Sequence, residues 1–225
     1  MTLSLAGCCG RTGMLGAIVM SSSPAVASRC ARARSRVGAA CSQNVTDPSL
    51  SDALLDRIAG GASAPDAMAA IRAAAVHIEY RQLIAVDAFG RAASFSGKQT
   101  LGTHADCTGQ DCAAAGNLLA DKAAPEAMAA AFAVDPAADL GDRLVAALRA
   151  GRDAGGEEGD VHSAGMVVVD SVSWPVTDLR VDWTDADPVE ELASLWRRWQ
   201  PLAADYVTRA LEPSLAPSYG VPGDE

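Results

Sequence analysis

The pattern of apolar and polar positions divides the first half of the chain into strands followed by helices. Apolar alternation at residues 3–6, turn residues at 10–13 and a β-prone apolar run at 15–20 predict a hairpin that starts at the N-terminus. We expect a third strand at 37–42. Apolar side chains at helical spacing in 50–58 and 64–75, separated by Gly60 and Gly61, predict two amphipathic helices.

The second half of the chain repeats this order of strands and helices. A turn at 87–90 separates two strand-like runs and predicts another hairpin. The expected elements are strands at 81–86 and 92–95, a strand beginning at 114–119, helices at 125–132 and 140–150, strands at 166–169 and 179–181, and a helix from 188 to 199. We expect Gly151 to end its helix and Pro201 to interrupt the last one.

The order of elements predicts the fold class. Strands, two helices, strands, two helices, strands and a helix lack the strict alternation of a doubly wound fold. They indicate an α+β protein with antiparallel sheets and helices layered outside. The length of 225 residues, 49% of them hydrophobic, fits one domain. We expect that domain to cover 1–205, followed by a Pro- and Gly-rich tail at 206–225.

Charge and cysteine spacing exclude several classes of partner. A net charge of −10 leaves no basic surface for nucleic acid or an anionic membrane, and no apolar stretch is long enough to span a bilayer. The six cysteines follow no zinc or disulfide spacing. We therefore expect a cytoplasmic protein with reduced thiols, no metal and no cofactor.

The first thirty residues also imitate a secretory signal. Arg11, the apolar run 14–20 and the small residues 25–27 are arranged like a signal and its cleavage site. The run is short and contains Gly16, which favours the cytoplasmic interpretation. The alternative, a secreted protein, predicts a mature chain that begins near Ser28.

Thr2 is the main candidate for chemistry. Removal of Met1 would place a free α-amine beside the hydroxyl of the same residue. An α-amine with a pKa of about 8 is partly neutral at physiological pH and can take the hydroxyl proton. A Met-Thr start is common, however, and by itself indicates only efficient removal of methionine.

A series of short motifs carries a resemblance over residues 2–200. The motifs are the strand from Thr2, Leu15-Gly16 to Ser21, Val37-Gly38-Ala39 with Ser42-Gln43 and Pro48, Arg81-Gln82 to Gly90, Ser96-Gly97, Gly116-Asn117, the residues 143–151, Ser163-Ala164, and the residues 178–182 with Asp187-Pro188. In this order they resemble the uncharacterised bacterial family called domain of unknown function 1028, which is grouped with the N-terminal nucleophile (Ntn) hydrolases. The resemblance implies a four-layer αββα sandwich. It also implies amide hydrolysis by a terminal threonine, without naming a substrate.

The resemblance assigns candidate roles to three residues. Thr2 would be the nucleophile, with its own amine as base. Asn117 would donate a hydrogen bond to the oxyanion, and a turn-capping Gly-Asn is the alternative. Ser21 would orient the amine, although a serine at a strand end often bonds only to backbone.

A second set of residues is expected to bind the substrate, a small amide whose carboxylate an arginine could hold. The candidates are Arg34, Gln43, Arg81, Gln82, Ser96, Gly116, His162 and Ser163. Arg36 competes with Arg34, and the alternative for both is an ordinary surface position. Arg81 and Gln82 at the head of a strand could instead simply lie on the sheet. A Ser–His pair at 162–163 is not expected, because adjacent residues on a strand point to opposite faces.

Departures from the family pattern leave two classes of function open. The family's Gly-Gly-Asp appears as Gly155-Gly156-Glu157, and Gly159-Asp160 and His162 replace an Arg-Gly and a Gln. The leading hypothesis is an amidohydrolase. The alternative is a non-catalytic ligand-binding or regulatory subunit on the same scaffold. We also expect a homodimer through the C-terminal helix that carries Trp196 and Trp199.

Overall fold

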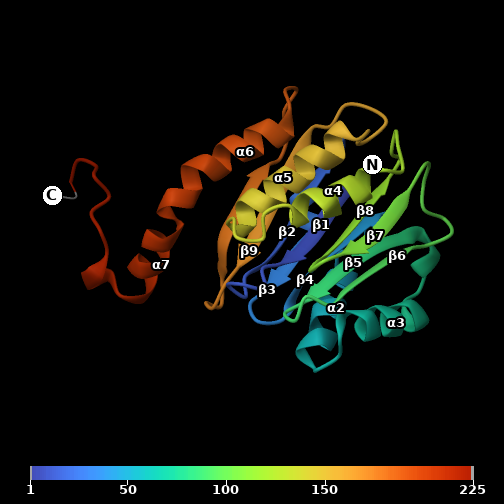
Figure 1. The fold of residues 1–225 in the computed structure, drawn as a ribbon, viewed down its shortest axis with the longest axis horizontal. Coiled ribbons are helices and arrows are strands. Elements are labelled where there is room, and N and C mark those ends of the chain that lie inside the picture. The colour runs from blue at the N-terminus through green and yellow to red at the C-terminus, as the bar shows by residue number, and fades with distance from the viewer. Residues whose placement is uncertain (1, 224–225) are drawn as a thin grey trace.

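The computed structural model describes residues 2–223, which form two antiparallel sheets with helices packed against them (Figure 1). Met1, whose removal the catalytic hypothesis requires, lies outside the described residues. The six-stranded sheet has the order β10-β9-β2-β1-β8-β7, and the four-stranded sheet has the order β3-β4-β5-β6. The expected α+β class is confirmed.

The strand bounds place the first strand in the middle of the larger sheet. That sheet contains β1 (Thr2–Cys8), β2 (Leu15–Ser21), β7 (Ala105–Gly109), β8 (Cys112–Asn117), β9 (Ser163–Val169) and β10 (Pro175–Val181). The smaller sheet contains β3 (Ala31–Arg34), β4 (Gly38–Asn44), β5 (Arg81–Asp87) and β6 (Ala92–Ser96). Strand β1 pairs with both β2 and β8, so the start of the chain lies between two other strands.

The main helices pack against the sheets in two groups (Figure 1). The helices are α1 (Val26–Arg29), α2 (Ser49–Ala59), α3 (Ala64–Ala74), α4 (Ala124–Ala133), α5 (Leu140–Asp153), α6 (Pro188–Trp199) and α7 (Ala203–Leu211). Helices α4, α5 and α6 contact strands of the larger sheet, whereas α2 and α3 contact strands of the smaller one.

Three buried apolar clusters lie between these layers: under the helices of the larger sheet, between the two sheets, and under the helices of the smaller sheet. The side chains of β1 alternate between the first two clusters. Leu3 and Leu5 belong to the cluster under α4 and α5. Ala6 and Cys8 belong to the cluster between the two sheets. Since side chains alternate along a strand, the even-numbered positions of β1 face the other sheet. The side chain of Thr2 therefore also points between the sheets.

Most predicted elements are confirmed, and the exceptions have local causes. The sequence did not indicate β3, which is four residues long and half-buried, or β7, whose side chains are half-buried or exposed at a sheet edge. Helix α5 continues past Gly151 to Asp153. A Cβ at Gly151 would lie 2.5 Å from Cγ of Met128, so this glycine permits close helix packing rather than ending the helix.

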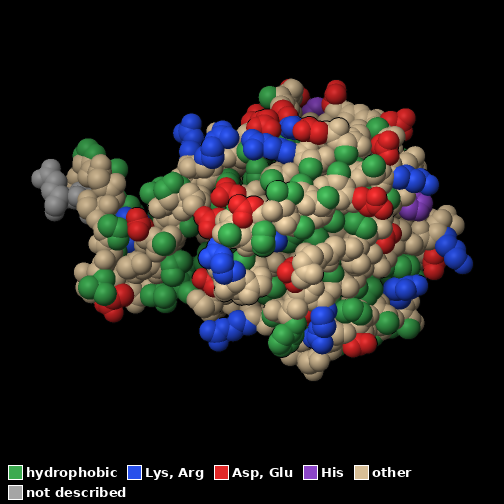
Figure 2. Space-filling model, viewed as in Figure 1, with side chains coloured by type: hydrophobic (Ala, Val, Ile, Leu, Met, Phe, Trp, Pro, Cys, Tyr) green, Lys and Arg blue, Asp and Glu red, His purple; other side chains and the backbone are tan. Residues whose placement is uncertain are grey.

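The C-terminal helices differ in how they pack. On α6, the indole of Trp196 donates to Asp142 and that of Trp199 donates to the carbonyl of Val176, so both tryptophans pack on their own chain. A short 3-10 turn at Gln200–Leu202 follows, as expected from Pro201. Helix α7 and the segment after it extend from the body, and none of residues 203–211 is buried (Figures 1 and 2). The predicted tail therefore includes most of this helix.

Gly7 offers a test of the packing between β1 and the helices. A Cβ there would lie 2.5 Å from Cζ of the fully buried Phe132. We predict that Gly7→Ala lowers the free energy of unfolding by about 1–3 kcal/mol, because the ring cannot withdraw from a packed core. Gly10→Ala is the matched control, since the nearest atom to its Cβ lies at 3.9 Å. Urea unfolding of both variants checks this, and equal stabilities would contradict the packing described.

Candidate active site

Four polar side chains form a row across the larger sheet, on the face toward the smaller sheet. Ser21 of β2 pairs with Ser163 of β9, and Thr2 of β1 pairs with Asn117 of β8. Strands β1 and β2 are neighbours, and Thr2 Oγ1 lies 3.5 Å from Ser21 Oγ. All four residues are buried, with Thr2 6% exposed. Strand alternation and register thus bring together residues from four separate parts of the chain.

A second polar row lies opposite, on the smaller sheet. Gln43 of β4 pairs with Gln82 of β5, which in turn pairs with Ser96 of β6. Cys41 and Ile84, two positions along the same strands, belong to the cluster between the sheets, so the glutamines share that face. The two rows therefore meet at one end of the interlayer.

Gln82 links the two rows through hydrogen bonds in both directions. Its Oε1 accepts from Asn117 Nδ2 at 3.1 Å and from Gln43 Nε2 at 2.8 Å, and its Nε2 donates to the Gly116 carbonyl at 3.0 Å. Gln43 Oε1 accepts from Ser4 Oγ at 2.6 Å. This network fixes the Asn117 amide so that its Oδ1 points away from Gln82, and that oxygen is buried without a partner among residues 2–223.

A chain of hydroxyl groups runs from Thr2 to an arginine. Ser21 Oγ lies 2.8 Å from Ser23 Oγ, which accepts from Arg29 Nη2 at 2.5 Å. A guanidinium can only donate, so the Ser23 hydrogen is available to Ser21 and the Ser21 hydrogen is available to Thr2. In this arrangement Ser21 can donate to Thr2 Oγ1.

Glu157 is the site residue that sequence reasoning missed. It lies in the loop after α5, forms a bridge with Leu119 just beyond β8, and accepts from the backbone N–H of Ser22 at 3.0 Å through Oε2. The residue is only 8% exposed, and Oε1 has no partner among residues 2–223. Burial raises the pKa of its carboxyl to about 7, against the hydrogen bond from Ser22. An acidic side chain within the Gly-rich segment was the available signal.

Two predicted arginines lie apart from the polar rows. Arg34 pairs with Gly38, at the far end of β4 from Gln43, and forms an exposed ion pair of 2.8 Å with Asp56. Arg81 precedes Gln82 on β5, so its side chain takes the opposite face, and its guanidinium donates to the Val45 carbonyl. Arg34 thus lies at a half-exposed surface position, and Arg81 lies half-buried on the face of the smaller sheet away from the polar rows.

The pair at 162–163 occupies the rim of the row. Ser163 Oγ donates to the Ser23 carbonyl at 2.6 Å and accepts from the Val26 N–H, which gives it a role in holding the turn after β2. His162 stacks on Trp183 with ring centroids 4.2 Å apart. The imidazole and the Ser163 hydroxyl therefore do not form a Ser–His pair.

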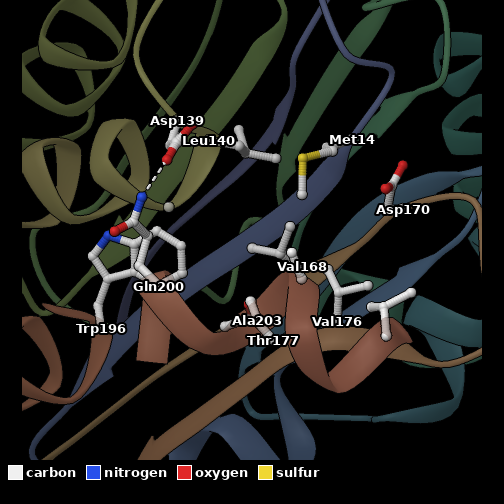
Figure 3. A pocket seen from close by; sticks show the side chains of 13 residues that line it. Met14, Asp139, Leu140, Val168, Asp170, Val176, Thr177, Trp196, Gln200 and Ala203 are labelled. Carbon is white, nitrogen blue, oxygen red and sulfur yellow. Dashed lines mark hydrogen bonds between the residues drawn. The ribbon is translucent and has the colours of Figure 1, made fainter. Parts of the chain in front are cut away.

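Thr2 is enclosed in this structure. Five surface cavities formed by residues 2–223 lie elsewhere, and Thr2, Ser21 and Asn117 line none of the five. Figure 3 shows an apolar groove of about 220 Å³ that Met14, Val168 and Trp196 line, on the helix side of the larger sheet. A cavity of about 260 Å³ includes His162 and borders the loop that carries Glu157.

Comparisons with known proteins agree over most of the chain. The model of the family described as "Family of unknown function (DUF1028)" matches residues 2–192. The chain belongs to the DUF1028 family. The crystal structure of protein SPO2555 from Silicibacter pomeroyi, also titled as DUF1028, is similar with 28% identity and a TM-score of 0.82, covering 91% of this chain and 89% of that one. No curated protein matches the sequence.

Three further features of this DUF1028 protein concern possible metal ligands, cysteines and membrane-spanning helices within residues 2–223. Within that range, no three His, Cys, Asp or Glu side chains are grouped to hold a metal ion. All six cysteines lie in the same range and are free thiols. No helix of the described chain is both long and apolar enough to cross a membrane.

The central position of Gln82 can be tested by stability. Gln82→Leu removes the Gln82 acceptor of the buried Gln43 and Asn117 amides, although Gln43 keeps its bond to the Ala115 carbonyl, and we predict a loss of about 2–5 kcal/mol in the free energy of unfolding. The exposed Gln99→Leu serves as control and should change stability by less than about 0.5 kcal/mol. Chemical denaturation measures both. A loss at Gln82 no larger than at Gln99 would show that the network does not join the sheets.

Proposed function

We propose that the protein is an N-terminal nucleophile amidohydrolase in which Thr2, after removal of Met1, cleaves the C–N bond of a small linear or cyclic amide. The observation that carries this proposal is the buried row in which the Thr2 hydroxyl lies beside Ser21, while Thr2 is the sheet partner of Asn117 on the neighbouring strand. A four-layer αββα sandwich of the Ntn type is part of the proposal. The three apolar clusters between helices and sheets support it.

The proposed reaction needs only the groups of Thr2, the substrate and water. Thr2 Oγ attacks the amide carbonyl, and its proton passes to the neutral α-amine of the same residue. The tetrahedral intermediate collapses as the C–N bond breaks, and the leaving nitrogen takes the proton from the ammonium. Water then attacks the resulting ester, the amine again receives a proton, and Thr2 Oγ leaves with it.

Asn117 and Ser21 have supporting roles in this scheme. One N–H of the Asn117 amide is engaged by Gln82, and the other can donate to the oxyanion of the tetrahedral intermediate. Ser21 donates to Thr2 Oγ1, which positions the hydroxyl and directs its proton toward the amine. Arg29 reinforces this direction through Ser23.

Thr2 is only 6% exposed, and we propose that a neighbouring segment moves to admit the substrate. The loop with Glu157 is the element we propose to move. It begins at Gly155 and Gly156, which have positive φ angles of 118° and 38°, and it borders the cavity at His162.

The enclosure of Thr2 favours a second candidate, a non-catalytic protein on the same scaffold. Such a protein would bind a ligand in one of the surface cavities or regulate a partner subunit. It would use the buried polar rows only for stability. The two candidates differ in whether Thr2 takes part in turnover.

Thr2 substitution decides between them. The intact mass of the purified protein is expected to lack Met1, and a panel of amides and ureides is expected to include a substrate. Thr2→Ala should lower its turnover by at least about a thousandfold, because the nucleophile is lost. Thr108→Ala, at an exposed position of β7, is the control. Retention of Met1, or unchanged turnover in Thr2→Ala, would reject the amidohydrolase.

We propose that the expected homodimer forms through α7 rather than through the tryptophans of α6. Trp196 and Trp199 are engaged within the chain, whereas Tyr206, Leu211 and Leu215 are 42%, 61% and 75% exposed. We predict that Leu211→Asp weakens self-association at least about tenfold in analytical ultracentrifugation, because a carboxylate is costly to bury. A wild-type protein that stays monomeric at all concentrations would exclude the dimer.

A further inference from the structure

The loop that carries Glu157 covers the position where β1 begins. Its backbone pairs with the chain beyond β8, where Glu158 N–H donates to the Leu118 carbonyl at 2.9 Å and Ala120 N–H donates to the Gly156 carbonyl at 3.2 Å. On the other side, Glu157 Oε2 accepts from Ser22, directly after β2. Because β1 lies between β2 and β8, the loop spans the end of β1 at Thr2.

Two buried acceptors at this end of β1 lack a donor among residues 2–223. They are Asn117 Oδ1 and Glu157 Oε1. Asn117 is 1% exposed and pairs with Thr2 in the sheet, whereas Glu157 belongs to the covering loop. A buried acceptor without a partner is costly, and more so when it is charged. Both acceptors belong to residues at the end of the sheet where β1 begins, and this points to a missing cationic donor there.

The missing donor is available from the chain itself once it begins at Thr2. A free α-ammonium at Thr2 has three N–H donors and a positive charge, and it lies at the start of β1 under the loop. We propose that Glu157 and Asn117 together form the seat of the liberated Thr2 α-amine, with Glu157 as the positioning residue that binds it by charge and hydrogen bond. This inference rests on the proposed function, because it requires the removal of Met1.

The seat would control both the place and the protonation of the base. Hydrogen bonds from the amine to Asn117 Oδ1 and Glu157 Oε1 would hold the amine beside the hydroxyl of the same residue, Thr2. The pKa of the Glu157 carboxyl, which burial raises to about 7, lies close to the ordinary value of about 8 for an α-amine, so the two groups titrate as a pair. His162 also acts on Glu157 and lowers the pKa of that carboxyl.

The test measures the Thr2 amine directly and needs no substrate. In protein labelled with ¹³C-threonine, the Cα resonance of Thr2 reports the titration of the adjacent amine by NMR. We expect Glu157→Gln to lower the pKa of the α-amine by about one or more, because a nearby opposite charge favours the ammonium form. Glutamine keeps an acceptor for the Ser22 N–H, so a purely structural role of Glu157 would leave the amine pKa unchanged.

Neighbouring substitutions make the comparison specific. Glu158→Gln removes the same charge from an exposed position one residue away, and it should leave the pKa of the amine within about 0.2 of wild type. Glu157→Asp keeps the charge and should hold that pKa close to wild type. If Glu157→Gln does not fold, Glu157→Ser replaces it, because serine removes the charge with a smaller side chain. We expect the same fall in the pKa of the Thr2 amine.

The outcomes separate this inference from the proposed function. If Met1 is absent and Glu157→Gln leaves the amine pKa as in wild type, the proposed binding of the amine by Glu157 is wrong. The proposal that Thr2 is the nucleophile is not affected by this result. If the amine pKa falls as expected but Thr2→Ala retains turnover, the amidohydrolase is wrong while the seat stands. If the mass shows that Met1 is retained, both are overturned.

Discussion

The central position of β1 is the constraint on which the candidate site depends. The strand pairs with β2 on one side and β8 on the other, so its first described residue, Thr2, lies inside the larger sheet rather than at a sheet edge. A strand in this position must satisfy its backbone groups on both sides. Its beginning is therefore held as firmly as its middle, and Thr2 is fixed relative to Ser21 and Asn117.

The family resemblance assigned the candidate residues, and strand periodicity explains why several of them lie together on one face. Alternation in β1 gives Thr2 the face opposite to Leu3 and Leu5, and the hairpin with β2 carries Ser21 to the same end. Gln43 and Gln82 follow from the same rule on the smaller sheet. Polar residues at the ends of apolar strands are visible in a sequence because they interrupt a regular pattern.

Other features of the site depend on contacts that no local pattern encodes. Arg34 was predicted near the ligand, yet antiparallel pairing with Gly38 carries it to the opposite end of its sheet, where Asp56 of α2 binds it. Glu157 belongs to an irregular loop, so its place over β1 is set by bonds to residues distant in sequence. The edge strand β7 was missed for a related reason, because a half-exposed strand lacks a clear apolar alternation.

A crystal structure of the mature protein at a resolution that defines its first residue tests the central claim most directly. The account predicts that the chain begins at Thr2, with its nitrogen about 3 Å from both Glu157 Oε1 and Asn117 Oδ1 and on the same side as its own hydroxyl. A chain that begins with an ordered Met1, or a Thr2 nitrogen directed away from both oxygens, would contradict it.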